Sequence, residues 1–406
     1  MNSFEYKVMY LMMVTADANN NKYYKMIPHG STFTVEYGRV GSTPQIRSYN
    51  IKDWDKKIRE KLKKGYTDKS ELMADLIEKQ DTTKSLYKDI PNSDIAEIVE
   101  RLQSMARQTV SANYNITSDK VTQAMVDKAQ DILNTLTSTT EVEQFNTLLL
   151  ELFEVIPRKM KVVSQYLANS MEDYSKIIQT EQSLLDVMKG QVYQHTVQAK
   201  EEDTTQDTPK VTILEAMGLE FEPVDDLDII KIKYCLGDNE NRFYRAWRVK
   251  NHNTQKQFDE YLQNNHQPET KLLWHGSRNE NWWSIINSGL VLRPTNAVIT
   301  GKMFGYGIYF ATKAQKSIGY TSLEGSYWAR GSSKSAYMGL YSVAYGTPYD
   351  VHSFNSKYYS LNYEKLQELS KGANCLHAHA GKMLKNDEIV VYNQSQTTIQ
   401  YLVEIR

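Results

Sequence analysis

The spacing of apolar residues divides the chain into three regions. In the first, the runs YKVMYLMMV (6–14) and STFTVEYGRVG (31–41) are rich in β-branched and aromatic residues, which predicts strands. The segment that follows repeats apolar residues at helical intervals: Ile51, Trp54, Ile58 and Leu62. Gly65 is suited to end this helix. We therefore expect residues 1–75 to form a small, β-rich α+β module.

Residues 90–195 carry four successive apolar stripes with a helical period. The first three are Ile95, Ile98, Val99, Leu102, Met105; Val121, Met125, Ile132, Leu133, Leu136; and Val142, Phe145, Leu148, Leu149, Leu152, Ile156. The fourth is Tyr174, Ile177, Ile178, Leu184, Leu185, Met188. Ser93 or Asp94 and then Ser118 are the expected N-caps, and Pro157 and Gly190 are the expected ends. Because each stripe needs a partner, the region predicts an all-α helical bundle.

From residue 210 to 406 the pattern changes to short β-rich runs joined by glycine-rich connections. The runs are DIIKIKYCL (228–236), FYRAWRVK (243–250), KLLWHG (271–276), GIYFA (307–311), GLYSVAYG (339–346), EIVVYN (388–393) and IQYLVEIR (399–406). They predict an α+β domain with a mostly antiparallel sheet. The polar, acidic segment 194–209 before this domain is expected to be a linker.

Charge and cysteine usage narrow the class of protein. Residues 1–69 contain 13 Lys and Arg against 7 Asp and Glu, a net charge of +6, although the whole chain carries −1. This asymmetry favours a polyanionic partner for the first module, and the alternative is a solvated basic helix. Cys235 and Cys375 lie too far apart for a ligand pair, which favours a reducing, intracellular compartment. We expect no membrane span or signal peptide, because no apolar run approaches about 18 residues.

Three stretches of the last region carry candidate chemistry: WHGS (274–277), GKMFGYGIYFATKAQKSIGY (301–320) and NDEIVVYNQSQTTIQYLVEI (386–405). Each stretch is weak evidence on its own. The glycines at 301, 305 and 307, for example, lack the spacing of a dinucleotide-binding fingerprint. Taken in order, they resemble the His–Tyr–Glu signature of the poly(ADP-ribose) polymerase catalytic domain. The resemblance covers residues 210–406 and implies an ADP-ribosyltransferase fold with NAD as substrate and no metal.

The same resemblance assigns roles to individual residues. His275, Tyr309 and Glu388 are the implied catalytic residues. The implied NAD-binding residues are His275, Gly276, Ser277, Arg293, Tyr309, Ser317 and Tyr320. His275 would reach a ribose hydroxyl, while the Gly276 backbone and the Ser317 hydroxyl would hold the carboxamide. The Tyr320 and Tyr309 rings would enclose the nicotinamide, with Ser277 and Arg293 on the adenosine side.

Glu388 is the central assignment. Loss of nicotinamide leaves positive charge on the ribose, and a carboxylate bonded to the 2-hydroxyl stabilises that charge. Register favours Glu388 over Glu404 and Asp387, and a glutamate there is typical of chain-elongating members. The nearby CLHAHAG (375–381) invites a metal site at Cys375, His377 and His379, but we interpret it as a loop containing histidines.

Residues 1–75 resemble the WGR module of DNA-dependent members, with Tyr37-Gly38-Arg39 at the position of Trp-Gly-Arg. Tyr37 would pack on an exposed sugar or base, and Arg39 would link phosphate to the helical region. Alternatively, Tyr37 belongs to the core and the module binds only protein. The helical region 90–195 sits where DNA-activated members carry an autoinhibitory subdomain, which would open on DNA binding.

These observations predict a poly(ADP-ribosyl)transferase activated by DNA breaks, which bind residues 1–75. It would modify proteins, including itself, and extend the growing chains. Its expected location is intracellular and DNA-associated, in the cytoplasm or nucleoid of a bacterium or the nucleus of a eukaryote. The alternatives are a mono-ADP-ribosyltransferase on the same fold and a non-catalytic scaffold that binds DNA and ADP-ribose.

Overall fold

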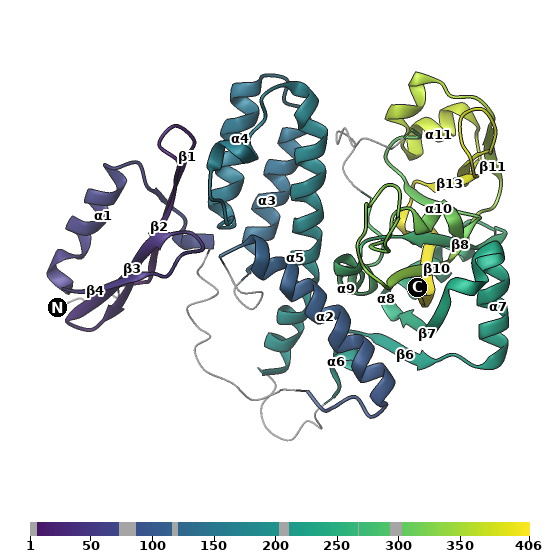
Figure 1. The fold of residues 1–406 in the computed structure, drawn as a ribbon, viewed down its shortest axis with the longest axis horizontal. Helices are drawn as coiled ribbons and strands as arrows, with labels where there is room; N and C mark the ends of the chain where they lie inside the picture. The colour runs from purple at the N-terminus through teal and green to yellow at the C-terminus, as the bar shows by residue number, and fades with distance from the viewer. Residues whose placement is uncertain (1–5, 73–86, 116–120, 203–210, 267, 293–302) are drawn as a thin grey trace. The chain divides into compact units, whose positions relative to one another are not determined.

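A computed structural model describes residues 6–72, 87–115, 121–202, 211–266, 268–292 and 303–406. The chain folds into two compact units (Figure 1). Unit 1 comprises residues 1–84 and 107–192, and unit 2 comprises residues 85–106 and 193–406. One boundary therefore falls inside helix α2 (Ser93–Asn113), whose first part packs within unit 2 and whose last part packs within unit 1.

Unit 1 begins with a five-stranded antiparallel sheet in the order β4-β3-β2-β1-β5. Its strands are β1 (Met9–Thr15), β2 (Asn20–His29), β3 (Thr32–Arg39), β4 (Gln45–Asn50) and β5 (Thr67–Asp68). One face packs on helix α1 (Trp54–Leu62), where Trp54 joins Leu11 and Phe33 in an apolar cluster. Two predicted strands, the helix and its end at Gly65, where φ is +86°, are confirmed. Leu62, however, is 45% exposed and does not face this core.

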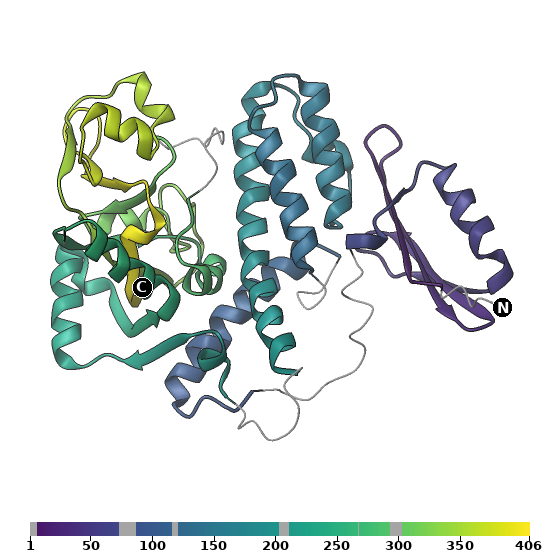
Figure 2. The same ribbon diagram turned by 180° about the vertical axis from the view of Figure 1, so that it is seen from behind.

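Helices α3 (Gln123–Leu136), α4 (Val142–Val155) and α5 (Tyr174–Glu202) lie side by side (Figure 2). Most of their predicted apolar residues are buried, while Val142, Leu148, Ile177 and Leu184 are half-buried. Three predicted ends are wrong or untested. Thr122 caps α3, and Ser118 lies outside the described residues. Asn92, not Ser93 or Asp94, caps α2, because its Oδ1 accepts from two following N–H groups.

Gly190 does not end α5, which continues to Glu202. A single helical glycine costs only about 1 kcal/mol relative to alanine, and no proline follows it before residue 209. The predicted linker is therefore helical over 194–202, and its remaining residues lie outside those described.

Polar contacts join the sheet of unit 1 to α4 and the segment that follows it. Asn21 Nδ2 donates to the Arg158 carbonyl at 2.8 Å. The Glu154 carboxylate on α4 accepts from the Val14 N–H at 3.2 Å and from the Thr67 hydroxyl at 2.7 Å, and pairs with Lys69 at 3.3 Å. The structure does not clearly show a separate all-α bundle, because α3, α4 and α5 up to residue 192 belong to the same compact unit as the β-rich module.

Arg158 and Glu181 form an ion pair in the interior of this unit. Their side chains are 6% and 5% exposed, and Arg158 Nε lies 3.3 Å from Glu181 Oε2. Arg158 Nη1 also donates to the carbonyl and the side-chain oxygen of Asn113, at 3.0 and 2.7 Å. One guanidinium thus connects the end of α2, the segment after α4, and α5.

Unit 2 is built on a nine-stranded mixed sheet in the order β11-β12-β13-β9-β8-β10-β14-β7-β6. Only the β11–β12 pair is parallel among these neighbours. The strands are β6 (Leu219–Pro223), β7 (Phe243–Asn251), β8 (Thr270–Gly276), β9 (Ile308–Ala311), β10 (Ala336–Ala344), β11 (Pro348–Val351), β12 (Cys375–Ala378), β13 (Glu388–Val391) and β14 (Thr397–Ile405). Six of the seven predicted runs are strands of this sheet.

The seventh run, DIIKIKYCL, was predicted as a strand and is instead helix α7 (Asp226–Leu236). The side chains of Asp225 and Asp228 form a capping box at its start, and Gly237, with φ +55°, follows its end. Asp228, Ile232 and Leu236 are buried at a four-residue interval, which is a helical period. The histidine-containing loop predicted over 375–381 also begins as a strand, β12.

The remaining α-helices of unit 2 connect these strands. They are α6 (Ile213–Ala216), α8 (His252–Asn264), α9 (Trp282–Ser288), α10 (Ala314–Ile318) and α11 (Tyr363–Leu369). Cys235 and Cys375 are free thiols. Within the part of the chain that the structure describes, no helix is both long and apolar enough to cross a membrane.

Replacing Arg158 with methionine should lower the free energy of unfolding by about 3–5 kcal/mol, because Glu181 would be left buried without its cation. Urea unfolding followed by far-ultraviolet circular dichroism measures this change. Lys128→Met is the matched control, since its pair with Glu151 is 48% and 38% exposed and should contribute about 0–1 kcal/mol. Equal effects of the two substitutions would contradict the importance of the buried pair.

Candidate active site

Strand β9 brings the three sequence motifs of unit 2 together. On one side, Ala311 of β9 pairs with Glu388 of β13, and on the other side it pairs with Trp274 of β8. His275 follows Trp274, and its Nδ1 lies 3.0 Å from the carbonyl oxygen of Tyr309. Residues more than a hundred positions apart in the chain are thereby held on three adjacent strands.

His275 is positioned as a neutral hydrogen-bond acceptor. Burial lowers the pKa of His275, although the contact with the Tyr309 carbonyl opposes this effect. A carbonyl can only accept, so Nδ1 carries the proton and Nε2 keeps its lone pair. Phe310 and Tyr341 pack edge-on against the imidazole, with ring centroids 5.8 and 6.1 Å away, and fix its orientation.

Gly276 and Ser317 are in backbone contact. A Cβ atom placed on Gly276 would lie 2.0 Å from the Ser317 carbonyl oxygen, so no other residue fits without a backbone shift. Ser317 lies on α10 and is buried. Ser277 is half-buried, and its Oγ accepts a hydrogen bond from Asn281 Nδ2 at 3.0 Å.

Two tyrosines lie near the Glu388 carboxylate. The Tyr309 hydroxyl donates to the Gly305 carbonyl at 2.9 Å and accepts from the Phe304 N–H at 3.1 Å. Burial, and then the charge of Glu388, raise the pKa of Tyr320 to about 12. The same two causes, in the same order, raise the pKa of Tyr309 further. Both hydroxyls therefore stay neutral near pH 7.

Glu388 is 6% exposed, and its Oε1 lies 2.6 Å from Lys316 Nζ. Sequence reasoning missed this lysine. It precedes Ser317 in the KSxxY motif, but its pairing with Glu388 depends on α10 packing against the strands, a contact between distant segments. An ammonium group at this distance forms a charge-assisted contact with the carboxylate and holds it in one orientation.

The rejected alternatives to Glu388 have other partners. Asp387 Oδ2 accepts from His377 Nε2 at 2.8 Å. Glu404 is fully buried on β14, where Arg245 Nε donates to it at 2.7 Å and Arg101 Nη1 lies 3.4 Å away. Arg101 belongs to the first part of α2, so this part of the helix is fastened to the sheet of unit 2.

Arg293, the predicted NAD-binding arginine, lies outside the described residues.

Tyr37 and Arg39 lie on β3 in unit 1. Tyr37 is half-buried and packs on Tyr24, with ring centroids 5.9 Å apart. Arg39 donates to the carbonyls of Asn19, Met160 and Lys161 at 2.8, 2.9 and 2.6 Å. Arg39 thus joins the sheet to the segment after α4.

Comparison with known proteins agrees with this geometry. Residues 235–406 match the poly(ADP-ribose) polymerase catalytic domain, and residues 7–72 match the WGR domain. Protein 101L of Invertebrate iridescent virus 6 is 32% identical over 233 residues, which is 56% of this chain and 94% of the viral protein.

Two further relatives carry descriptive names. The putative poly [ADP-ribose] polymerase-like protein 100L of the same virus is 30% identical over 168 residues, 41% of this chain and 87% of that protein. Poly [ADP-ribose] polymerase 2 of Zea mays is 24% identical over 408 residues, 87% of this chain and 60% of the maize protein.

Because residues 235–406 match this catalytic domain, the protein is an NAD+ ADP-ribosyltransferase, which consumes NAD as its substrate. The WGR match indicates DNA binding. The chain belongs to the poly(ADP-ribose) polymerase family.

Gly276→Ala should reduce activity by about a hundredfold, because the added Cβ forces apart two backbones that line the site, and displacement of about 1 Å can have such an effect. Release of nicotinamide from NAD measures the loss. Gly381→Ala is the matched control, since a Cβ there meets nothing within 4 Å among the described residues. Wild-type activity in Gly276→Ala would exclude a close contact at this point.

Proposed function

We propose that this protein is a DNA-activated poly(ADP-ribosyl)transferase, which transfers ADP-ribose to proteins, including itself, and to growing chains. The observation that carries the proposal is the pairing of β9 with β8 and β13. It holds His275, Tyr309 and Glu388 on three adjacent strands, and helix α10 adds Lys316, which pairs with Glu388 at 2.6 Å. The match to the catalytic domain supports the same assignment.

The nicotinamide end of NAD is held by polar backbone and flat rings. The Gly276 backbone approaches the carboxamide, because no side chain intervenes, and the Ser317 hydroxyl offers a further hydrogen bond. Tyr320, which is 38% exposed, stacks on the nicotinamide ring, with Tyr309 on the opposite side. His275 Nε2 accepts a hydrogen bond from a ribose hydroxyl. On the adenosine side we assign Ser277 and, from the sequence alone, Arg293.

Glu388 stabilises the transition state. As the bond between ribose C1 and the nicotinamide nitrogen breaks, positive charge develops on C1 and the ring oxygen. The Glu388 carboxylate accepts a hydrogen bond from the ribose 2-hydroxyl and opposes that charge. It also accepts the proton of the attacking acceptor hydroxyl as a new bond forms at C1. Lys316 orients the carboxylate.

Glu388→Gln should slow nicotinamide release by about 10²–10³-fold and abolish polymer, because the amide cannot oppose the developing charge. NAD affinity, measured by calorimetric titration, should change little. The exposed Glu364→Gln on α11 serves as the control. Products from labelled NAD are separated on a gel: a polymer ladder from wild type supports elongation, a single added unit supports the mono-transferring alternative, and long polymer from Glu388→Gln contradicts the assignment.

DNA activation is proposed to begin at the basic first module. Residues 1–69 carry the net charge of +6, and neutralisation of phosphates dominates the affinity of such surfaces for DNA. We place the Tyr37 ring against an exposed sugar or base of a strand break. Because Arg39 contacts the carbonyls of residues 160 and 161, a change at the sheet reaches the helices of unit 1, which we propose restrain the transferase.

Arg39→Ala should lose most of the stimulation by nicked or blunt DNA and keep the basal rate, because it removes the contact between the sheet and residues 160–161 without touching the proposed catalytic residues. The measurement is nicotinamide release with and without a DNA duplex at fixed salt, since salt changes affinity strongly. Undiminished stimulation would remove Arg39 from the relay. A lowered basal rate would instead indicate general damage to the fold.

A further inference from the structure

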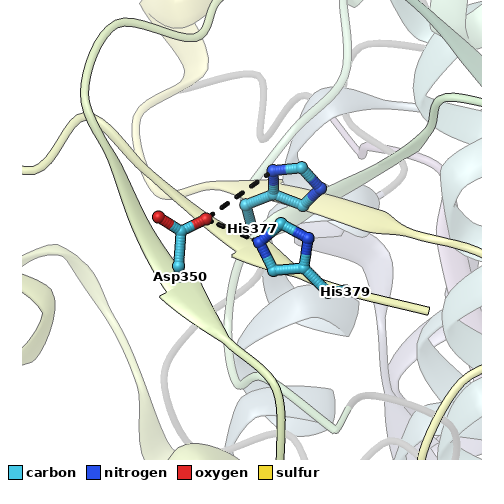
Figure 3. A group of neighbouring side chains, drawn as sticks. All are labelled: Asp350, His377 and His379. Atoms are coloured by element: carbon cyan, nitrogen blue, oxygen red, sulfur yellow. Dashed lines mark hydrogen bonds and ion pairs between the residues drawn. The ribbon is translucent and has the colours of Figure 1, made fainter. Parts of the chain in front are cut away.

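A cluster of histidines and aspartates lies outside the candidate NAD site, where β11, β12 and β13 meet. Asp350 comes from β11, His377 from β12, and His379 directly follows that strand (Figure 3). Among the described residues, they form the one group of three or more His, Cys, Asp or Glu side chains whose donor atoms all lie within 4.8 Å of one another. The parallel register of β11 and β12 places Asp350 opposite His377.

The donor atoms converge on a single point. Asp350 Oδ1 lies 2.6 Å from His379 Nε2 and 3.9 Å from His377 Nδ1, and the two imidazole rings stack with centroids 3.9 Å apart. Figure 3 shows both rings turned toward the same carboxylate oxygen. The Asp350 side chain is 50% exposed, which leaves an open approach from solvent.

A fourth residue prepares His377 to bind a cation. His377 Nε2 lies 2.8 Å from Asp387 Oδ2, and a carboxylate at this position accepts the Nε2 proton and leaves Nδ1 as a lone pair. A second carboxylate bonded to the far nitrogen of a ligating histidine is the usual support of a metal ligand. The Tyr345 hydroxyl lies 2.8 Å from His377 Nδ1, so an incoming ion displaces one neutral hydrogen bond there.

We propose that Asp350, His377 and His379 form a binding site for a divalent transition-metal ion, with Zn²⁺ the best match. Two imidazole nitrogens and one carboxylate oxygen, with water as a fourth ligand, are a donor set that tetrahedral zinc accepts. Zn²⁺ takes the place of the proton on His379 Nε2; solvent accepts that proton and supplies one to Nδ1, so the imidazole stays neutral. The ion opens the 2.6 Å contact between His379 and Asp350 and ties β11 to β12.

The proposed metal site lies on the strand next to the one that carries Glu388, the proposed catalytic carboxylate. Ala378, between the two histidines, pairs with Glu388 on β13, and Asp387 immediately precedes Glu388. An ion bound at His377 and supported by Asp387 therefore holds the start of β13 against β12. The role we assign is structural, and it requires no metal in the transfer reaction.

The test uses the full chain, freed of metal by chelation and titrated with Zn²⁺, and with Co²⁺ as a spectroscopic probe. Wild type should bind one equivalent, show the visible bands of four-coordinate Co²⁺, and unfold at a higher temperature with Zn²⁺. Asp350→Asn and His379→Gln should each weaken binding at least about tenfold and remove the thermal shift. The control is His252→Gln, which should bind Zn²⁺ as wild type does. His252 lies 2.6 Å from Glu220, but this pair belongs to no group of three or more possible metal ligands among the described residues.

Two outcomes would overturn the proposal. One is a wild-type chain that takes up no metal at millimolar concentration. The other is binding that both cluster variants retain at full strength, which would locate the ion elsewhere. Circular dichroism of the metal-free variants establishes that they are folded, and the exposed Asp350→Asn substitution keeps the test valid even when the histidine variant is destabilised.

Discussion

The four residues of β9 are the constraint on which the transferase unit depends. Their hydrogen bonds hold β13 on one side and β8 on the other, and both neighbours pair with Ala311. A shift by one residue would turn Glu388 to the opposite face of the sheet, because side chains alternate along a strand. The carbonyl of Tyr309 adds a second constraint, since it fixes the tautomer of His275.

The electrostatics of this site are simple because few of its groups are charged. Burial keeps His275 neutral and both tyrosines protonated. Among the described residues of the site, Glu388 and Lys316 form an ion pair at 2.6 Å. Under the proposed function, the positively charged nicotinamide of NAD meets a preorganised environment, in which the Glu388 carboxylate opposes the charge that moves onto the ribose.

The sequence alone predicted those strands and helices that have a clear apolar pattern or carry one of the three motifs. The strands bearing His275, Tyr309 and Glu388 were predicted correctly, and so were the apolar faces of α3 and α4. Residues 228–236 were misassigned because a run dense in isoleucine and lysine suits a strand as well as a helix. The capping aspartates of α7 were the available signal.

Contacts between distant segments could not be predicted. Lys316 meets Glu388, Arg101 meets Glu404, and Asp350 meets His379 only because the sheet brings their strands and helices together. Glu154 and Asn21 connect the first sheet to α4 and the segment after it through single polar side chains. A single polar residue produces no periodic pattern in the sequence, so these contacts could not be predicted.

Arg39 reaches residues 160 and 161 through main-chain oxygens rather than side chains. Such a contact survives almost any amino-acid replacement at those two positions, provided that the backbone keeps its path. Relatives could therefore diverge freely there while retaining the same mechanical link. Methods that detect coupled sites from correlated substitutions would therefore miss the contact of this arginine with residues 160 and 161.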